Sequence, residues 1–223
     1  MPVLLVTAVV ACTSENYDVG DGANSYLTAD LALVATSADG TVRSARIDDG
    51  ESLLFSNPFA LNWAQKPDSV YRALLYYDKT ADDTGMDNTT VKARSCQQVP
   101  VLVPVDAAKV DDMHTDPLGL ESVWLSKRGD YINLSLLLKS GKATGDDAVH
   151  TLGIVNNGTT TDGDKRVLHL ELYHDQGSMP EYYTVQRYFS IDTATLGNVD
   201  RVELTLNTYE GRKVEEVSCL RNN

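Results

Sequence analysis

The sequence predicts an all-β protein, built as a small N-terminal barrel followed by a C-terminal antiparallel β-sandwich. In the second half of the chain, apolar and polar residues alternate with a period of two, which is typical of half-buried strands. Clusters of Gly, Asn and Asp separate these runs and indicate turns. No long segment carries the apolar stripe of a helix packed against a core. These observations together favour two β-domains packed from short strands.

The clearest strands lie in the second half. Leucine, isoleucine or valine occupies alternate positions in the runs 132–138, 168–172 and 202–206. Turn signals lie between the strands, at 127–130, 156–158, 162–164 and 210–212. This spacing of strands and turns predicts a β-sandwich over residues 119–223.

The first half has shorter strands. The β-prone runs are 26–36, 41–47, 53–55, 70–77, 91–93 and 99–103. Five or six short strands within about 80 residues suit a small closed or partly open barrel, which we place at residues 25–104. Residues 105–118 are rich in aspartate and poor in apolar side chains, so we expect them to form a linker.

The N-terminal residues predict export. Residues 1–11 are uncharged and largely apolar, with the length of a secretory signal core and too short to span a bilayer, which takes about 20 apolar residues. Val9-Val10-Ala11-Cys12 resembles the lipobox of bacterial lipoproteins, in which the cysteine thiol takes up the lipid. The alternative is a buried strand with a chance cysteine, but the polar run that follows cannot bury itself. We therefore expect a signal peptide at 1–11 and a flexible tether at 12–24, lipidated at Cys12.

The charge of the chain limits the kinds of partner it can bind, and its cysteine content raises the question of a disulfide. The formal charge is −13, from 32 acidic and 19 basic residues spread along the chain, which argues against nucleic acid because phosphates demand clustered Lys and Arg. Apart from Cys12, two cysteines remain in an oxidising compartment, Cys96 and Cys219. They either form a disulfide between the two domains or are two small buried residues, and the sequence leaves both open.

No motif of catalysis or metal binding is present. The chain has no phosphate-binding glycine loop, zinc-protease histidine pair or nucleophile elbow. His169 and His174 are five residues apart on a predicted strand, so their side chains point to opposite faces. The acidic run 82–88 lacks the spacing and terminal Glu of a calcium-binding EF-hand, and we interpret it as a hairpin tip. We assign no catalytic residue, metal ligand or cofactor, and we expect no enzyme.

Aromatic residues give the one positive indication of a ligand. Tyrosine is far commoner than Phe and Trp, with 11 Tyr against three Phe and two Trp. Such amphipathic rings suit both sheet packing and stacking on sugars. OB-like barrels bind oligonucleotides or oligosaccharides, and the acidic charge excludes the former. The candidate ligand contacts are Trp63, Tyr77 and Tyr182.

Several features together resemble the NigD-like proteins, which are lipoproteins of Bacteroidetes. They are the lipobox, the acidic tether, a barrel opening with Tyr26-Leu27, the turns Ala38-Asp39-Gly40-Thr41 and Asp48-Asp49-Gly50, and a final sandwich. The resemblance implies an OB-like domain before a β-sandwich and a lipid-anchored place at the outer membrane, with no catalytic residues to carry over. Glu15 and Asp18 are similar to an acidic signal for surface display in that phylum. The sequence leaves open whether the protein faces the periplasm or the exterior.

Three classes of function remain. The favoured one is a non-enzymatic envelope lipoprotein that binds a glycan or a protein partner. The second is an accessory or structural subunit of an outer-membrane assembly, and the third is a hydrolase whose site is assembled from distant residues. An aromatic-lined groove would favour the first class, whereas a flat apolar patch would favour the second.

The lipobox yields a direct prediction. Mature wild-type protein should begin at Cys12, incorporate labelled palmitate and fractionate with membranes, because several buried acyl chains, at about 0.8 kcal/mol per methylene, make release slow. A Cys12→Ala variant should lose the label and globomycin sensitivity, and remain soluble or unprocessed. A wild type that takes up no palmitate would contradict the assignment.

Overall fold

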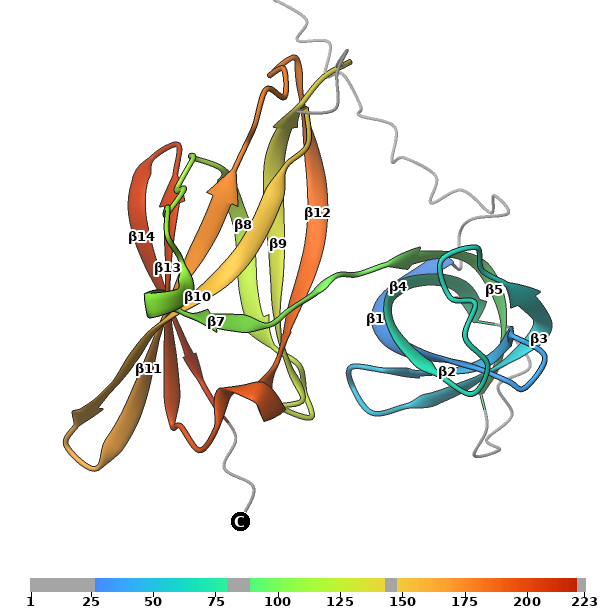
Figure 1. Cartoon of the computed structure of the whole chain (residues 1–223). Coiled ribbons are helices and arrows are strands. Elements are labelled where there is room, and N and C mark those ends of the chain that lie inside the picture. Colours follow the sequence, from blue (N-terminus) through green and yellow to red (C-terminus); the bar gives the residue numbers. More distant parts are fainter. Residues whose placement is uncertain (1–26, 80–88, 143–147, 220–223) are drawn as a thin grey trace, which may run out of the picture.

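The computed structural model describes residues 27–79, 89–142 and 148–219, and most of them lie in β-strands (Figure 1). The predicted barrel and sandwich are confirmed as the fold. The predicted signal peptide, Cys12, the predicted tether and the acidic run 82–88 lie outside the described residues. Within the described part, no helix is long and apolar enough to cross a membrane.

Five strands close into the N-terminal barrel, in the order β1-β2-β3-β5-β4. Their bounds are β1 (Leu27–Thr36), β2 (Thr41–Ile47), β3 (Ser52–Ala60), β4 (Val70–Lys79) and β5 (Thr89–Gln98). Neighbouring strands are antiparallel except β3 and β5, which pair in parallel. Closure leaves no unpaired sheet edge, which protects a small β-domain from adding further strands.

The barrel interior is filled by the inward side chains of alternate strand positions. On β4 these include Ala73, Leu75 and Tyr77, all with no exposed surface. Tyr77 is the bulkiest of the wholly buried residues, and its hydroxyl donates a hydrogen bond to Asp30 Oδ2 at 2.8 Å. Burial raises the pKa of Tyr77 well above its usual value, so the ring stays neutral inside the barrel.

The C-terminal sandwich consists of a five-stranded sheet, β14-β13-β11-β10-β7, and a four-stranded sheet, β6-β12-β9-β8. The bounds are β6 (Val101–Leu102), β7 (Pro104–Asp106), β8 (Gly119–Leu125), β9 (Tyr131–Ser140), β10 (Thr151–Asp162), β11 (Lys165–Asp175), β12 (Tyr183–Asp192), β13 (Arg201–Thr208) and β14 (Gly211–Ser218). The sheets are mixed and not purely antiparallel as expected, because β6–β12, β7–β10 and β11–β13 pair in parallel. Leucine, isoleucine and valine side chains fill the space between them.

Residues 105–118 are not the free linker that the sequence predicted. Val105 and Asp106 belong to β7, which forms the edge of the five-stranded sheet. Further along, Thr115 bridges His174, and Leu118 is fully buried in the sandwich core. The backbone groups of this segment thus form hydrogen bonds with the sandwich, and its few apolar residues pack against it. The chain passes from barrel to sandwich between β5 and β6, through only Val99 and Pro100.

A buried arginine joins the two domains. Arg72 on β4 is 4% exposed, and its guanidinium donates to both carboxylate oxygens of Asp48, at 2.5 and 2.6 Å. The same guanidinium donates to Asn133 Oδ1 at 3.0 Å and to Ser190 Oγ at 3.1 Å, on β9 and β12 of the sandwich. It also lies 4.3 Å from the centre of the Tyr131 ring. One barrel side chain therefore binds two strands of the sandwich.

An apolar cluster completes this seam. Leu31 and Leu74 of the barrel and Val99 of the connection are buried together. Three aromatic side chains, Tyr76, Trp124 and Tyr188, pack against them from both domains. The barrel and the sandwich are thus joined by a polar network and an apolar contact side by side.

Cys96 and Cys219 are both free thiols, so the disulfide that the sequence left open does not form. The reason is their position, because Cys96 packs against the barrel core and Cys219 against the sandwich core. Burial raises the pKa of the Cys96 thiol to about 12. The pKa of Cys219 is raised mainly by burial and further by the nearby Asp200 carboxylate.

This burial predicts slow thiol chemistry. Because the thiolate is the reactive form, Cys96 should alkylate at pH 8 on the order of a thousandfold more slowly than an exposed cysteine. Iodoacetamide labelling of a Cys12→Ala protein, followed by mass spectrometry, measures the rate at each thiol. The same labelling in urea is the control, and there both thiols should react freely. A Cys96–Cys219 linked peptide, or fast labelling of folded Cys96, would contradict the structure.

Removing the arginine should weaken the whole fold. Arg72→Met leaves the Asp48 carboxylate and the Asn133 amide without their shared donor, which should lower the free energy of unfolding by about 3 kcal/mol. The matched control is Arg43→Met, since Arg43 pairs with Asp39 at 2.8 Å with both side chains more than half exposed. That change should cost less than about 1 kcal/mol. Urea unfolding measures both, and equal losses would refute a central role for Arg72.

Candidate functional site

A groove lies on the seam between the barrel and the four-stranded sheet, with a volume of about 510 Å³. Strands β1 and β4 and the turn after β2 supply the barrel side, and β8, β9 and β12 supply the sandwich side. Its lining residues are Ala29, Asp30, Leu31, Asp48, Leu74, Tyr76, Glu121, Ser122, Trp124, Ser135, Gln186 and Tyr188. Both domains are therefore needed to form it.

The strand register places the three aromatic rings in the groove. Because side chains alternate along a strand and Tyr77 points into the barrel, Tyr76 points outward toward the sandwich. Trp124 pairs with Asn133, and Tyr188 with Ser135, on the two strands that flank β9. Asn133 and Ser135 are two residues apart and share the face of β9 that meets the barrel, so both rings lie on that face. All three rings are half-buried.

Polar groups lie beside the rings. The Glu121 carboxylate accepts hydrogen bonds from Ser135 Oγ and from the Gln186 amide. That amide also donates to the Tyr188 hydroxyl at 2.9 Å, which fixes the ring relative to the carboxylate. On the opposite wall, the Asp30 carboxylate accepts a hydrogen bond from the Tyr77 hydroxyl. The groove thus offers aromatic faces next to positioned hydrogen-bonding groups, the combination found in small-ligand sites.

The groove extends along the seam. A neighbouring hollow of about 310 Å³ shares Leu74, Tyr76, Gln186 and Tyr188 with it. This second hollow continues past Gln97, Gln98 and Pro100 at the domain connection and past Arg187 on β12. The two hollows therefore adjoin, and Tyr76 and Tyr188 line both of them.

A third hollow, of about 600 Å³, is less suited to a ligand. Three of its four charged side chains are already paired, because Asp130 lies 3.1 Å from Arg128 and 4.0 Å from Arg46. The one aromatic ring in its lining is that of Tyr131, which Arg72 already covers. We therefore take the aromatic groove as the candidate site.

None of the three aromatic residues proposed from the sequence lines this groove. Tyr77 is wholly buried in the barrel, so it cannot contact a ligand, and that proposal is wrong. Trp63 is half-buried, packs against the barrel core and meets Tyr71 edge-on with ring centres 6.0 Å apart. Tyr182 is 79% exposed and lies outside the groove lining.

The residues that line the groove were not predicted from the sequence, and the reason is physical. The Tyr76-Tyr77 pair did indicate that one ring faces outward, and this signal could have pointed to Tyr76. Trp124 and Tyr188 carried no comparable signal, because they become a site only where the barrel docks on β8, β9 and β12. The docking itself depends on contacts between residues far apart in the chain, such as Arg72 and Ser190.

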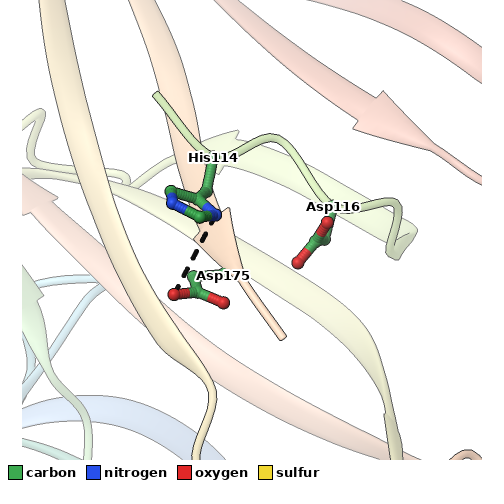
Figure 2. Close-up of side chains that lie close together, drawn as sticks. All are labelled: His114, Asp116 and Asp175. Atoms are coloured by element: carbon green, nitrogen blue, oxygen red, sulfur yellow. Dashed lines mark ion pairs between the residues drawn. The ribbon is translucent and has the colours of Figure 1, made fainter. Parts of the chain in front are cut away.

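The four histidines lie outside the groove lining. His169 contacts Thr160 and Glu203, whereas His174 stacks on His150 with their ring nitrogens 2.9 Å apart. Burial lowers the pKa of His174. His114 instead lies with Asp116 and Asp175, and one possible ligand atom from each is within 4.8 Å of the others (Figure 2). This group was not predicted from the sequence, because His114 was expected to lie in a linker.

Comparison with known proteins identifies relatives of the fold. Residues 101–219 match the NigD-like C-terminal β-sandwich domain. The chain is similar in structure to a NigD-like immunity protein from Bacteroides caccae, with 22% identity, a TM-score of 0.65 and coverage of 85% of this chain and 91% of that one. It is also similar to a candidate lipoprotein from Bacteroides fragilis, with 14% identity, a TM-score of 0.65 and coverage of 88% and 99%.

A third similar structure is a protein of unknown function from Bacteroides vulgatus, at 16% identity and a TM-score of 0.60, covering 88% of this chain and 93% of that one. No curated protein matches the sequence. At such identities the structural neighbours establish the shared fold alone.

Proposed function

Because this chain belongs to the NigD-like family, we propose that it is an envelope lipoprotein that binds a glycan in the groove between barrel and sandwich. The observation that carries this proposal is the set of three half-buried rings, Tyr76, Trp124 and Tyr188, beside the Glu121–Gln186 pair. Sugars present apolar C–H faces and many hydroxyls, and this lining offers a partner for each.

The shape and the charge of the groove indicate which class of ligand it can bind. Two adjoining hollows suit an oligosaccharide better than a single sugar. Asp30, Asp48 and Glu121 are all part of the lining, and the whole chain carries a formal charge of −13. An acidic surface disfavours anionic ligands, so the proposed ligand is a neutral glycan.

Binding without turnover is the form of activity that fits the groove. Each carboxylate in the lining accepts hydrogen bonds from neighbouring protein groups: Asp30 from Tyr77, Asp48 from Arg72, and Glu121 from Ser135 and Gln186. These bonds hold the carboxylates in structural roles. A hydrolase of this kind would instead need an acid and a base aimed at one bond.

The proposed location rests on the lipobox. Val9-Val10-Ala11-Cys12 and the polar run after it support a lipid anchor at Cys12, and one structural neighbour is described as a candidate lipoprotein. A tether of about a dozen residues would let the folded domains reach ligands beyond the membrane surface.

A second candidate function, as an accessory subunit of an outer-membrane assembly, is favoured by a different surface. Val101, Val103 and Val105 are 39%, 62% and 44% exposed along the segment that forms the edge strands β6 and β7. Exposed valines at a sheet edge suit contact with another protein. A pull-down from envelope extract, with Val103→Asp as the variant, tests this surface separately from the groove.

The groove predicts a specific mutational pattern. On an array of neutral oligosaccharides, Trp124→Ala and Tyr188→Ala should each weaken binding by about tenfold or more, because each removes a central aromatic contact. The matched control is Tyr182→Ala, which removes an exposed ring outside the groove and should leave affinity unchanged.

Two outcomes would overturn the proposal. One is the absence of any neutral glycan bound by the wild type, and the other is a loss of binding on Tyr182→Ala with the groove variants unaffected. Release of shortened sugars by the purified protein would show that the bound glycan is a substrate.

A further inference from the structure

The segment before β8 brings two potential metal ligands against the end of β11. His174 N donates to His114 O at 3.0 Å, and Asp116 N donates to His174 O at 2.9 Å, so Thr115 and His174 form a parallel bridge. In such a bridge Thr115 and His174 point to one face. His114, Asp116 and Asp175 therefore point to the other, where Figure 2 shows them around one space.

The hydrogen bonds of His114 leave one ring nitrogen free. Its Nε2 lies 3.1 Å from Asp112 Oδ2, and an ionised carboxylate can only accept, so the neutral ring carries its proton on Nε2. Its Nδ1 then presents a lone pair. This atom lies 4.0 Å from Asp175 Oδ2, beyond hydrogen-bond distance. Two donors with metal bonds of about 2.0–2.2 Å can share one ion across such a gap.

Each aspartate also keeps one oxygen that accepts no hydrogen bond from the described part of the chain. Asp175 Oδ1 accepts the Gly177 N–H at 2.8 Å, and Asp116 Oδ2 accepts the Gln176 N–H at 2.8 Å. These backbone bonds orient the two carboxylates. The remaining oxygens, Asp175 Oδ2 and Asp116 Oδ1, are free to bind an ion.

Among the residues that the structure describes, no Lys or Arg pairs with the carboxylates of Asp112, Asp116 and Asp175. Within the described ranges, the ion pairs of Asp112 and Asp175 involve only His114, and Asp116 has none. A bound cation would neutralise this cluster.

We propose that His114, Asp116 and Asp175 bind one divalent transition-metal ion, with Asp112 as the positioning residue that orients the His114 ring. One imidazole and two carboxylates form a mixed donor set that suits Zn²⁺ or Mn²⁺ better than Ca²⁺, which prefers oxygen ligands alone. Three protein ligands leave further positions for water. The ion would pin residues 112–116 to the end of β11, independently of the glycan groove.

Calorimetric titration of the full chain with ZnCl₂, MnCl₂ and CaCl₂ tests the proposal. We expect one Zn²⁺ or Mn²⁺ per chain, and binding weakened about 10- to 100-fold or more in His114→Ala and Asp175→Asn. Asp112→Asn should weaken it about tenfold while leaving the ligands in place. At a hundredfold excess over Kd, the metal should raise the Tm of the wild type by about 5 °C.

His169→Ala is the matched control, since it removes a histidine from β11 that lies outside the cluster and should bind metal as the wild type does. Circular dichroism checks that each variant is folded, and Asp116→Asn replaces His114→Ala if the latter is not. The proposal is overturned if neither Zn²⁺ nor Mn²⁺ binds stoichiometrically, if Ca²⁺ binds more tightly than both, or if folded cluster variants bind as the wild type does.

Discussion

The bidentate pair between Arg72 and Asp48 holds the architecture of this protein together. A charge as buried as that of Arg72 is costly unless every donor finds an acceptor, and here Asp48, Asn133 and Ser190 supply them. Only the planar fork of arginine can satisfy the carboxylate and both sandwich side chains together, so a lysine would not be equivalent. The interaction joins a barrel strand to two sandwich strands and so fixes the angle at which the domains meet.

The candidate site is a consequence of that docking. Tyr76 comes from the barrel and Trp124 from the sandwich, so neither domain alone contains the groove. Because β9 is buried on both faces, Leu134, Leu136 and Leu138 pack in the sandwich core, while Asn133 and Ser135 lie in the seam. The polar seam positions the aromatic rings, and the apolar cluster beneath them supports their inner edges. Stability and binding thus depend on the same contact surface.

The sequence predicted the elements better than their assembly. Alternation at 132–138 and 168–172 identified β9 and β11, and the Asp-Gly turns identified the hairpin between β2 and β3, because these signals are local. The edge strand β7 and the bridge at Thr115 were missed, since an aspartate-rich segment can pair with a sheet edge that only the folded sandwich offers. For the same reason the groove rings and the His114 cluster, assembled from distant residues, could not be found beforehand.

The acidic composition now has a structural explanation. Many aspartates begin turns, where one carboxylate oxygen accepts the N–H two residues later. Asp39, Asp49, Asp106, Asp175 and Asp192 all do so. A chain of short strands needs many such turns, so excess negative charge is by itself no sign of a ligand. What distinguishes Asp175 is that its second oxygen faces the free ring nitrogen of His114 across 4.0 Å. In this protein an aspartate becomes a candidate ligand only where the fold brings its unused oxygen to another donor.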